Sequence, residues 1–583
     1  MRAIVRAVSC MFVAVLTLAC GSGGGGSSSS TGGSPGGASI TGGNTDPVCT
    51  VGTSTGPVQK PQFVQNIPSG QTGWFASPVV ADLDHSGHNK LIAGYYSLFV
   101  YDAYGNRLAK ADGNGSRIYA PFVVADLDGS GVMDIVCGQG SQVYAYQWLN
   151  GGLKLKAGWP VDTSCAGQSP EVRGLAAADL DGTGKLEVVA TTTQTQSASV
   201  GGAQVFVYSP NGQIYQPAGG YAPAWPRYND RTDAGGDASR NGAGEDGYGC
   251  YGLNVGIGHI DDDPNPEIIV TYDNHAIQAF KNDGVAINAS SWFSNPDSTY
   301  LGDPMTWGQF IRWDDPTVEL DHYHLHTGAW PNPGTGQAWL QWTASPPSFG
   351  DLLGDGHKEV ICAPNVELGI PYVTQAYAVM ALQGDFGDGS RSAMRLPGWE
   401  TLPTGGTPVN VSGWYPPMGV PAPAVAKIQS GGNPEIIVSL NDGCMYAFTS
   451  TAALLWKYNY TNGKAIMFAS EPMIADLNQS GSPAIIFTTY GAPDVTDSGH
   501  LIILAANGAL LYDLPLPNPG HDGNGNGAPA APTVADLDGD GQLEIFVQTF
   551  DHGMDEFKVP GSGCNCLLWN NARGGLLRQG QPD

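Results

Sequence analysis

The stretch ADLDGDGQLEIFV, from Ala535 to Val547, places carboxylates at alternate positions of a short loop and then runs into an apolar, β-prone segment. Counted from Asp536, acids stand at positions one, three and five, Gly541 at position six and Glu544 at position nine. Calcium is a hard cation that takes about six to eight oxygen ligands, and alternate acids on a tight turn can supply them. An EF-hand would need a carboxylate at the twelfth position, where Val547 stands, so the sequence predicts a calcium loop that leads into a β-strand.

Weaker copies of this loop recur along the chain. The eight copies begin at Asp82, Asp126, Asp179, His259, Asp351, Lys427, Asp476 and Asp536. Most are followed by a second β-like segment that ends on a turn, so each unit is predicted as strand, loop, strand, turn and strand. One such unit cannot bury both of its faces alone, so the units must pack around an axis or stack in a row. The 83 glycines and 42 prolines of the 583-residue chain suit an all-β, turn-rich fold.

The repeated ADLDGDGxxEIxVG pattern resembles the FG-GAP or VCBS repeat, found in the heads of integrin α-subunits and in bacterial surface proteins. The resemblance covers about residues 60–575 and implies a β-propeller with structural calcium ions in its loops. Eight loops favour eight blades, and seven is the alternative. The C-terminal segment CLLWNNARGGLLRQGQ is expected to supply final strands that close the ring against the N-terminal segment.

The predicted metal ligands differ from loop to loop. Three loops keep every oxygen position: Asp126, Asp128, Ser130 and Asp134; Asp179, Asp181, Thr183 and Glu187; Asp536, Asp538, Asp540 and Glu544. Two keep part of the set: Asp351, Asp355 and Glu359; Asp261, Asp263 and Glu267. The first loop offers Asp82 and Asp84, but Lys90 stands where the last acid belongs and is expected to replace the cation. For every loop the alternative is a structural turn without metal.

The N-terminus predicts export. Residues 1–19 have two arginines before an apolar run that ends in LTLAC, which resembles a bacterial lipobox with Cys20 as the lipidated residue. Residues 20–47 are a tether rich in glycine and serine. We therefore expect a protein held by its lipid at the outer membrane or surface of a bacterium, with no other contact to the membrane. An ordinary signal peptide is the alternative.

The net charge limits the classes of binding partner, and the cysteine content suits disulfide bonds. The formal net charge is −28, and removal of the two arginines of the signal peptide makes it −30. This argues against binding nucleic acid or anionic lipid. Eight cysteines remain besides Cys10 and Cys20, an even number that suits disulfides without fixing their connectivity. Cys564 and Cys566 alone are a weak signal for zinc.

Insertions lengthen the middle repeats, at about residues 192–258, 284–348 and 384–424. In repeat folds such insertions often build a binding surface. Their rings suit either stacking on sugars and protein partners or plain packing onto the propeller. These rings are Tyr221, Trp225, Tyr228, Tyr248, Tyr251, Trp292, Trp307, Trp313, Trp330, Trp339, Trp342, Trp399, Trp414 and Tyr415.

One insertion holds a histidine cluster, His322, His324 and His326. In an extended segment all three point to one side, where they could bind a transition metal or supply a general base. Hydrogen bonding within the loop is the alternative, because no further ligand or nucleophile is evident.

Three classes of function remain open. The first, which the sequence favours, is a calcium-binding surface module, a monomeric propeller that binds a glycan or protein ligand and has no catalytic residues. The second is a polysaccharide-active enzyme resembling the calcium-dependent rhamnogalacturonan lyases. The third is a scaffold subunit of an envelope complex.

Overall fold

The computed structural model describes residues 52–582, with gaps. The gaps are 165–168, 194–204, 218–251, 262, 272–276, 285–298, 301–302, 305–338, 342–345, 368–375, 384–395, 397, 400–401, 410–413, 415–419, 463–466 and 565. All regular structure in the described residues is β-strand, and no helix among them is long and apolar enough to cross a membrane. The predictions for residues 1–47 and for the histidine cluster lie outside the described residues.

In the described residues, eight antiparallel sheets of three or more strands follow one another, one for each loop found in the sequence. The first four contain β2 (Val79–Ala81), β3 (Lys90–Gly94), β4 (Leu98–Tyr101) and β5 (Arg107–Ala111); β6 (Val123–Ala125), β7 (Asp134–Gln139), β8 (Gln142–Leu149), β9 (Gly152–Leu155) and β10 (Val161–Asp162); β11 (Val172–Ala178), β12 (Glu187–Thr192) and β13 (Val205–Tyr208); and β14 (Val255–Gly258), β15 (Glu267–Thr271) and β16 (Ile277–Phe280).

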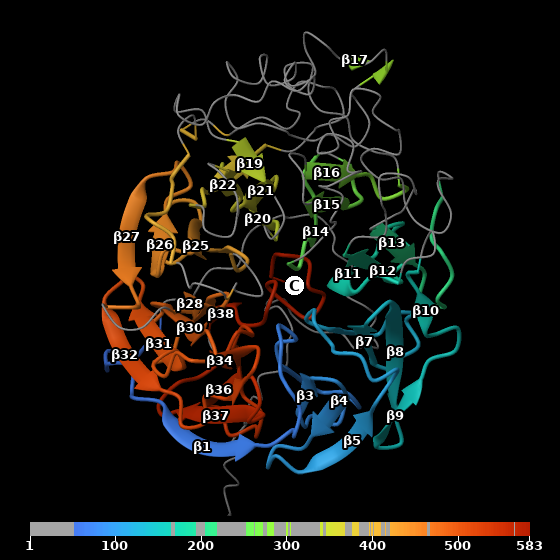
Figure 1. Cartoon of the computed structure of the whole chain (residues 1–583), viewed down its shortest axis with the longest axis horizontal. Helices are drawn as coiled ribbons and strands as arrows, with labels where there is room; N and C mark the ends of the chain where they lie inside the picture. The colour runs from blue at the N-terminus through green and yellow to red at the C-terminus, as the bar shows by residue number, and fades with distance from the viewer. Residues whose placement is uncertain are drawn as a thin grey trace, which may run out of the picture.

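The last four sheets complete the ring seen in Figure 1. They contain β20 (Ser348–Gly350), β21 (Glu359–Cys362) and β23 (Met380–Leu382); β24 (Ala424–Ala426), β25 (Glu435–Ser439), β26 (Cys444–Phe448) and β27 (Leu454–Asn459); β29 (Met473–Ala475), β30 (Ala484–Gly491), β31 (His500–Ala505) and β32 (Leu510–Pro515), with β28 (Phe468–Ala469), β33 (His521–Asp522), β34 (Gly525–Gly527) and β38 (Leu567–Trp569) attached; and β35 (Thr533–Ala535), β36 (Leu543–Gln548) and β37 (Met554–Val559) with β1 (Gln62–Ile67). Two separate pairs are β17 (Thr299–Tyr300) with β18 (Asp303–Pro304), and β19 (Trp339–Gln341) with β22 (Asn365–Glu367).

The sheets are the blades of a β-propeller, which confirms the predicted fold class. The first strand of each of the last six sheets packs against the first strand of the next, and β35 packs against β2. Each predicted unit of strand, acidic loop, strand, turn and strand is present, for example from β35 to β37. The short first strands are buried because sheets cover them on both sides, which explains their apolar sequences.

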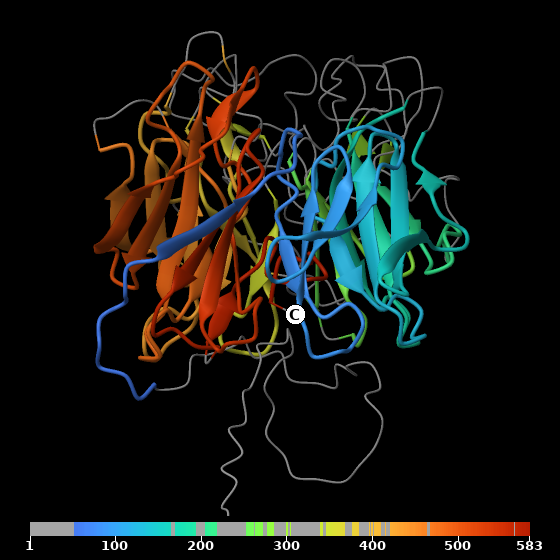
Figure 2. The same cartoon turned by 90° about the horizontal axis from the view of Figure 1, so that it is seen from below.

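The acidic loops all lie on one face of the ring, here called the loop face. Within each sheet the loop joins the first strand to the second, and hydrogen bonds connect loops of neighbouring sheets. For example, the side-chain amide of Asn89 donates to the carbonyl of Asp536 at 2.7 Å. The opposite side, where the first strands begin, is here called the entry face. Figure 2 shows the ring from its edge, with the strands running between these two faces.

Closure of the ring differs from the prediction for the C-terminal segment. The N-terminal strand β1 completes the last sheet by pairing with β37, from Gln62 opposite Lys558 to Ile67 opposite Met554. The C-terminal segment instead pairs through β38 with β29 and then enters the middle of the ring (Figure 1). It could not have closed the outer edge, because β1 already occupies that edge.

Residues 570–582 lie along the inner strands around the axis. Backbone N–H groups of Val124, Ala177, Ile257, Phe349 and Val534 donate to carbonyls of this segment, at 2.8 to 3.2 Å. The segment therefore supplies backbone acceptors to five different sheets. This satisfies polar groups that would otherwise face an apolar centre.

Candidate metal loops and the entry face

The loops share one hydrogen-bonding pattern that fixes two of the acids. The first acid accepts the backbone N–H of the sixth residue, as Asp126 does from Gly131 at 2.6 Å and Asp179 from Gly184 at 2.8 Å. That glycine has a positive φ, +81° at Gly131, which suits glycine and explains its recurrence. The first acid thus forms the turn, whatever else it binds.

The acid at the ninth position has the same role in every loop that keeps it. It accepts the N–H of the second loop residue, so that Leu127 donates to Asp134 at 3.2 Å and Leu180 to Glu187 at 3.1 Å. Because this acid begins the second strand, its side chain is buried, and the exposed fractions of Asp134 and Glu187 are 0% and 3%. The pattern gives the ninth-position acid a structural role even without metal.

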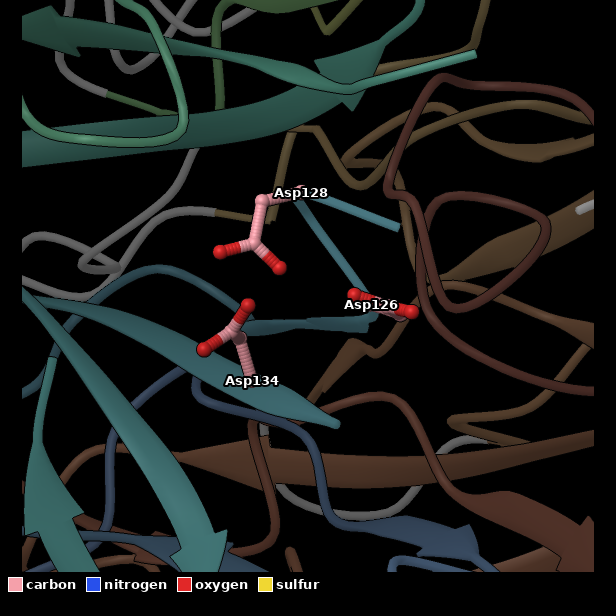
Figure 3. A group of neighbouring side chains, drawn as sticks. All are labelled: Asp126, Asp128 and Asp134. Carbon is pink, nitrogen blue, oxygen red and sulfur yellow. The ribbon is translucent and has the colours of Figure 1, made fainter. Parts of the chain in front are cut away.

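The Asp126 loop brings three predicted ligands together. One oxygen from each of Asp126, Asp128 and Asp134 lies within 4.8 Å of the others, and Figure 3 shows the three carboxylates turned toward one another. The ammonium of Lys156, which directly follows β9, lies 2.8 Å from Asp128 and 2.9 Å from Asp134. Burial is the largest single effect and raises the pKa of Asp128, but the hydrogen bonds from Lys156 and Ser130 and the charge of Lys156 together lower it to about 2.

A lysine also enters the Asp536 loop. The ammonium of Lys558, from β37, lies 2.6 Å from Asp538, 2.8 Å from Asp540 and 2.7 Å from Glu544. Asp536, Asp538 and Asp540 meet the same 4.8 Å criterion. Burial nevertheless raises the pKa of Glu544 to about 7.

The loop that begins at His259 repeats this arrangement. Asp261, Asp263 and Glu267 each offer an oxygen within 4.8 Å of the others. The ammonium of Lys281, next to β16, binds Asp261 and lies 3.0 Å from Asp263 and 3.4 Å from Glu267. A cation from the chain itself is thus present in the Asp126, His259 and Asp536 loops.

The Asp179 loop has the same three-acid cluster, and among the described residues no lysine forms an ion pair with its acids. Asp179, Asp181 and Glu187 come within 4.8 Å, and in the described part of the chain they accept hydrogen bonds from backbone N–H groups. Burial, helped by the nearby carboxylates, raises the pKa of Glu187 to about 7. An all-oxygen donor set with a buried acid of this kind fits calcium, which would be held by these three residues.

The two remaining loops of the prediction are less complete. In the Asp351 loop, burial raises the pKa of Glu359 to about 8, and its Oε1 atom has no hydrogen-bond partner. Asp351 and Asp355 belong to this loop but are absent from the three-acid clusters of the described residues. In the Asp82 loop, the ammonium of Lys90 lies 2.6 Å from Asp84. The hydroxyl of Ser130 reaches Asp126 at 3.5 Å, and the backbone N–H of Thr183 donates to Asp181 at 3.1 Å.

The entry face carries an aromatic cluster that the sequence analysis did not identify. Neighbouring ring centroids lie 5.2 to 6.5 Å apart along Trp414, Phe468, Tyr490, Phe550, Trp74, Tyr119 and Phe75. These rings come from segments far apart in the sequence, between residues 74 and 550, so no local pattern reveals them. Most are buried, so packing is their first role.

Two arginines cover the Trp74 and Tyr119 end of this cluster. The guanidinium of Arg117 lies 4.1 Å from the centre of the Trp74 ring, and that of Arg173 lies 3.8 Å from the Tyr119 ring. Glu171 holds both arginines, accepting bonds from Arg117 at 2.5 and 2.8 Å and from Arg173 at 2.6 Å. We call these five residues the arginine cluster.

Other predicted residues have mixed outcomes. Trp399 is fully buried, and Trp414 packs on Phe468, so packing is correct for these two rings. Cys564 and Cys566 are disulfide-bonded, which removes the weak zinc signal at that pair. Cys137 and Cys444 are buried thiols. Cys20, His322, His324 and His326 lie outside the described residues.

Residues 126–190 match the family model of the FG-GAP-like repeat. The match spans the Asp126 and Asp179 loops and confirms the resemblance predicted from them. No curated protein matches the sequence.

Several solved structures are similar to this chain in fold. The biofilm matrix protein Bap1 of V. cholerae is 12% identical, with 87% of this chain and 92% of that chain covered and a TM-score of 0.38. BamB from Moraxella catarrhalis is 12% identical, with 82% and 96% covered and a TM-score of 0.36. The exotype rhamnogalacturonan lyase YesX is 14% identical, with 85% and 75% covered and a TM-score of 0.34. Likenesses this distant carry no information on ligand or activity.

Proposed function

We propose that this protein is a binding module of the bacterial cell envelope, a propeller stabilised by calcium that binds a glycan or protein ligand on its entry face. The arginine cluster is the observation that carries this proposal. It combines charged groups near the surface with a rigid aromatic base, which is the composition of many recognition sites.

Charge suggests the kind of ligand. Two arginines and one glutamate leave the cluster with one net positive charge, in a chain whose formal net charge is −28. Guanidinium groups prefer carboxylates and other flat anions, to which they donate paired hydrogen bonds. The side chains of Arg117 and Glu171 are partly exposed, at 25% and 20%. A ligand with a single acidic group, such as a uronate-bearing glycan or an acidic side chain, fits this local charge better than a polyanion does.

Calcium has a structural role in this proposal. The Asp179 loop supplies three carboxylates and lies on the loop face, away from the arginine cluster. A bound cation would remove the repulsion among these acids and would join the first two strands of its sheet. No reaction step is assigned to the ion.

Attachment to the membrane rests on sequence alone. The lipobox-like LTLAC with Cys20, followed by the tether to about residue 47, supports a lipid anchor at the outer membrane or cell surface. Globomycin treatment of cells expressing the chain should cause the unprocessed form to accumulate, whereas an ordinary signal peptide predicts no effect.

The binding proposal is tested on an array that pairs uronate-bearing glycans with their neutral counterparts, followed by calorimetry on any hit. Arg117→Ala should weaken binding at least tenfold, while Arg107→Ala, an exposed position on β5, should leave it unchanged. Equal binding by both variants would overturn the site. An unsaturated product that absorbs in the ultraviolet would favour a lyase instead, and a protein captured without any glycan signal would favour the scaffold.

A further inference from the structure

The lysines of the Asp536 and His259 loops come from the same position of the sheet. In the Asp536 sheet, Glu544 on β36 pairs directly with Lys558 on β37. In the His259 sheet, Ile268 pairs with Phe280, so Lys281 follows at the step that faces Glu267. A side chain opposite the ninth loop residue points to the same side of the sheet as that residue. The amine therefore reaches the buried acid through the register of the two strands.

The hydrogen-bonding capacity of a lysine ammonium group also suits the three-acid site. A lysine has three N–H donors and no acceptor, which matches three carboxylate oxygens around it. Lys558 makes its three contacts at 2.6 to 2.8 Å, the range of charge-assisted hydrogen bonds. Calcium needs those same oxygens at about 2.3–2.6 Å. An ammonium and a calcium ion cannot both bind them.

In the Asp126 loop the lysine is also buried. The side chain of Lys156 is only 5% exposed and bridges Asp128 to the fully buried Asp134. Its backbone N–H donates to the carbonyl of Ala145 at 2.8 Å, which anchors the base of the side chain. A buried lysine held in this way is part of the folded sheet, and calcium would have to displace it into water.

We propose that Lys156, Lys281 and Lys558 are permanent internal cations that replace calcium in their loops. Calcium binding is then confined to loops without such a lysine, and the Asp179 loop is the first of these. The acidic motif alone therefore does not identify a calcium site in this chain. A loop binds calcium only where no lysine reaches its ninth-position acid from the neighbouring strands.

The Asp179 sheet provides a natural contrast. The backbone N–H of Tyr215 donates to Val207 at 2.8 Å, just as that of Lys156 donates to Ala145. Val207 pairs with Val189, and Ala145 pairs with Val136, two residues beyond the ninth-position acid in each sheet. Tyr215 thus stands where the other sheet has its lysine.

The test is the number of calcium ions per chain, measured by elemental mass spectrometry on the folded protein after equilibration with calcium and removal of free ion. Lys558→Met and Lys156→Met should each raise the count by one. Lys110→Met, a partly exposed lysine paired with Asp112, should leave it unchanged. An unchanged count in folded Lys558→Met and Lys156→Met proteins, verified by circular dichroism, would overturn the proposal.

A second pair of variants keeps every lysine in place. Asp181→Asn should lower the count by one, because its loop is predicted to bind calcium. Asp538→Asn should leave the count unchanged, because Lys558 already neutralises its loop. A calcium ion lost from Asp538→Asn would show that the ion displaces the lysine, and the proposal would be wrong whatever ligand the entry face binds.

Discussion

Arg573 and Glu471 meet at the axis of the propeller, where the backbone N–H of Arg573 donates to Oε1 of Glu471 at 2.6 Å. The same oxygen accepts the indole N–H of Trp569 at 2.8 Å. All three residues are buried. The guanidinium of Arg573 extends further and donates to the carbonyls of Val255 and Pro347, in two other sheets. The C-terminal segment is therefore tied across the ring by one buried acid.

Glu471→Ala should strongly destabilise the protein. It would leave two buried donors, the backbone N–H of Arg573 and the indole N–H of Trp569, without their acceptor, at a cost of about 1–3 kcal/mol each. Glu471→Gln is the matched control, because it keeps an acceptor oxygen and should cost clearly less. Urea unfolding followed by tryptophan fluorescence measures both. Equal stability of the alanine variant and the wild type would mean that the C-terminal segment does not tie the ring.

The blades were predictable because their signal is local. Each loop carries its own acids and glycine, and the hydrogen bonds within it, such as Gly541 to Asp536 at 3.0 Å, join residues a few positions apart. The path of residues 570–582 was not predictable. Its contacts join backbone groups hundreds of residues apart, as between Leu576 and Val124, and leave no side-chain pattern.

The lysine contacts were only partly predictable from the sequence. Lys558 comes fourteen residues after Glu544, and only the length of the turn between β36 and β37 places the two opposite each other. The sequence does contain a signal for Lys281 and Lys558, because both follow the ninth-position acid of their loop at the same spacing. The arginine cluster joins three different sheets, so only the assembled ring reveals it.

Because β1 closes the ring, a large-to-small substitution at Ile67 should strongly destabilise the protein. This side chain is 2% exposed, and it pairs with Met554 at the end of the strand that joins the two ends of the ring. Ile67→Ala should cost about 2–5 kcal/mol, as large-to-small changes in a core do. Val64→Ala, on the same strand but 48% exposed, should cost less than about 1 kcal/mol. Thermal unfolding compares the two, and similar melting temperatures would contradict closure by this strand.

The buried thiols should resist modification in the native protein. Cys137 and Cys444 are 0% and 2% exposed, and burial raises their pKa to about 12 and about 11. Both the low thiolate fraction and the lack of access suppress reaction. Iodoacetamide should label the two peptides only after denaturation, as read by mass spectrometry. Labelling of either peptide in the native state would show that its sheet opens.

The pH dependence of stability should reveal the uncompensated acids of the loop face. In the absence of calcium, burial raises the pKa of Glu187 to about 7 and that of Glu359 to about 8, above the ordinary value of 4.5. A raised folded-state pKa adds stability that is complete below about pH 4.5 and is lost as the pH rises through the folded value, at ~1.4 kcal/mol per unit of difference. In chelator, the melting temperature should therefore fall between about pH 5 and pH 8.

Glu187→Gln isolates the contribution of one loop. The variant has no acid to ionise there, so its melting temperature in chelator should fall less steeply over the same range than that of the wild type. Calcium should raise the melting temperature of the wild type more at pH 8 than at pH 5, because the cation binds the ionised carboxylate. Glu187→Gln should lose most of that calcium effect, whereas Glu435→Gln, in the loop without a carboxylate cluster, should keep it. Parallel pH curves for Glu187→Gln and the wild type would show that Glu187 is already neutralised in the folded chain.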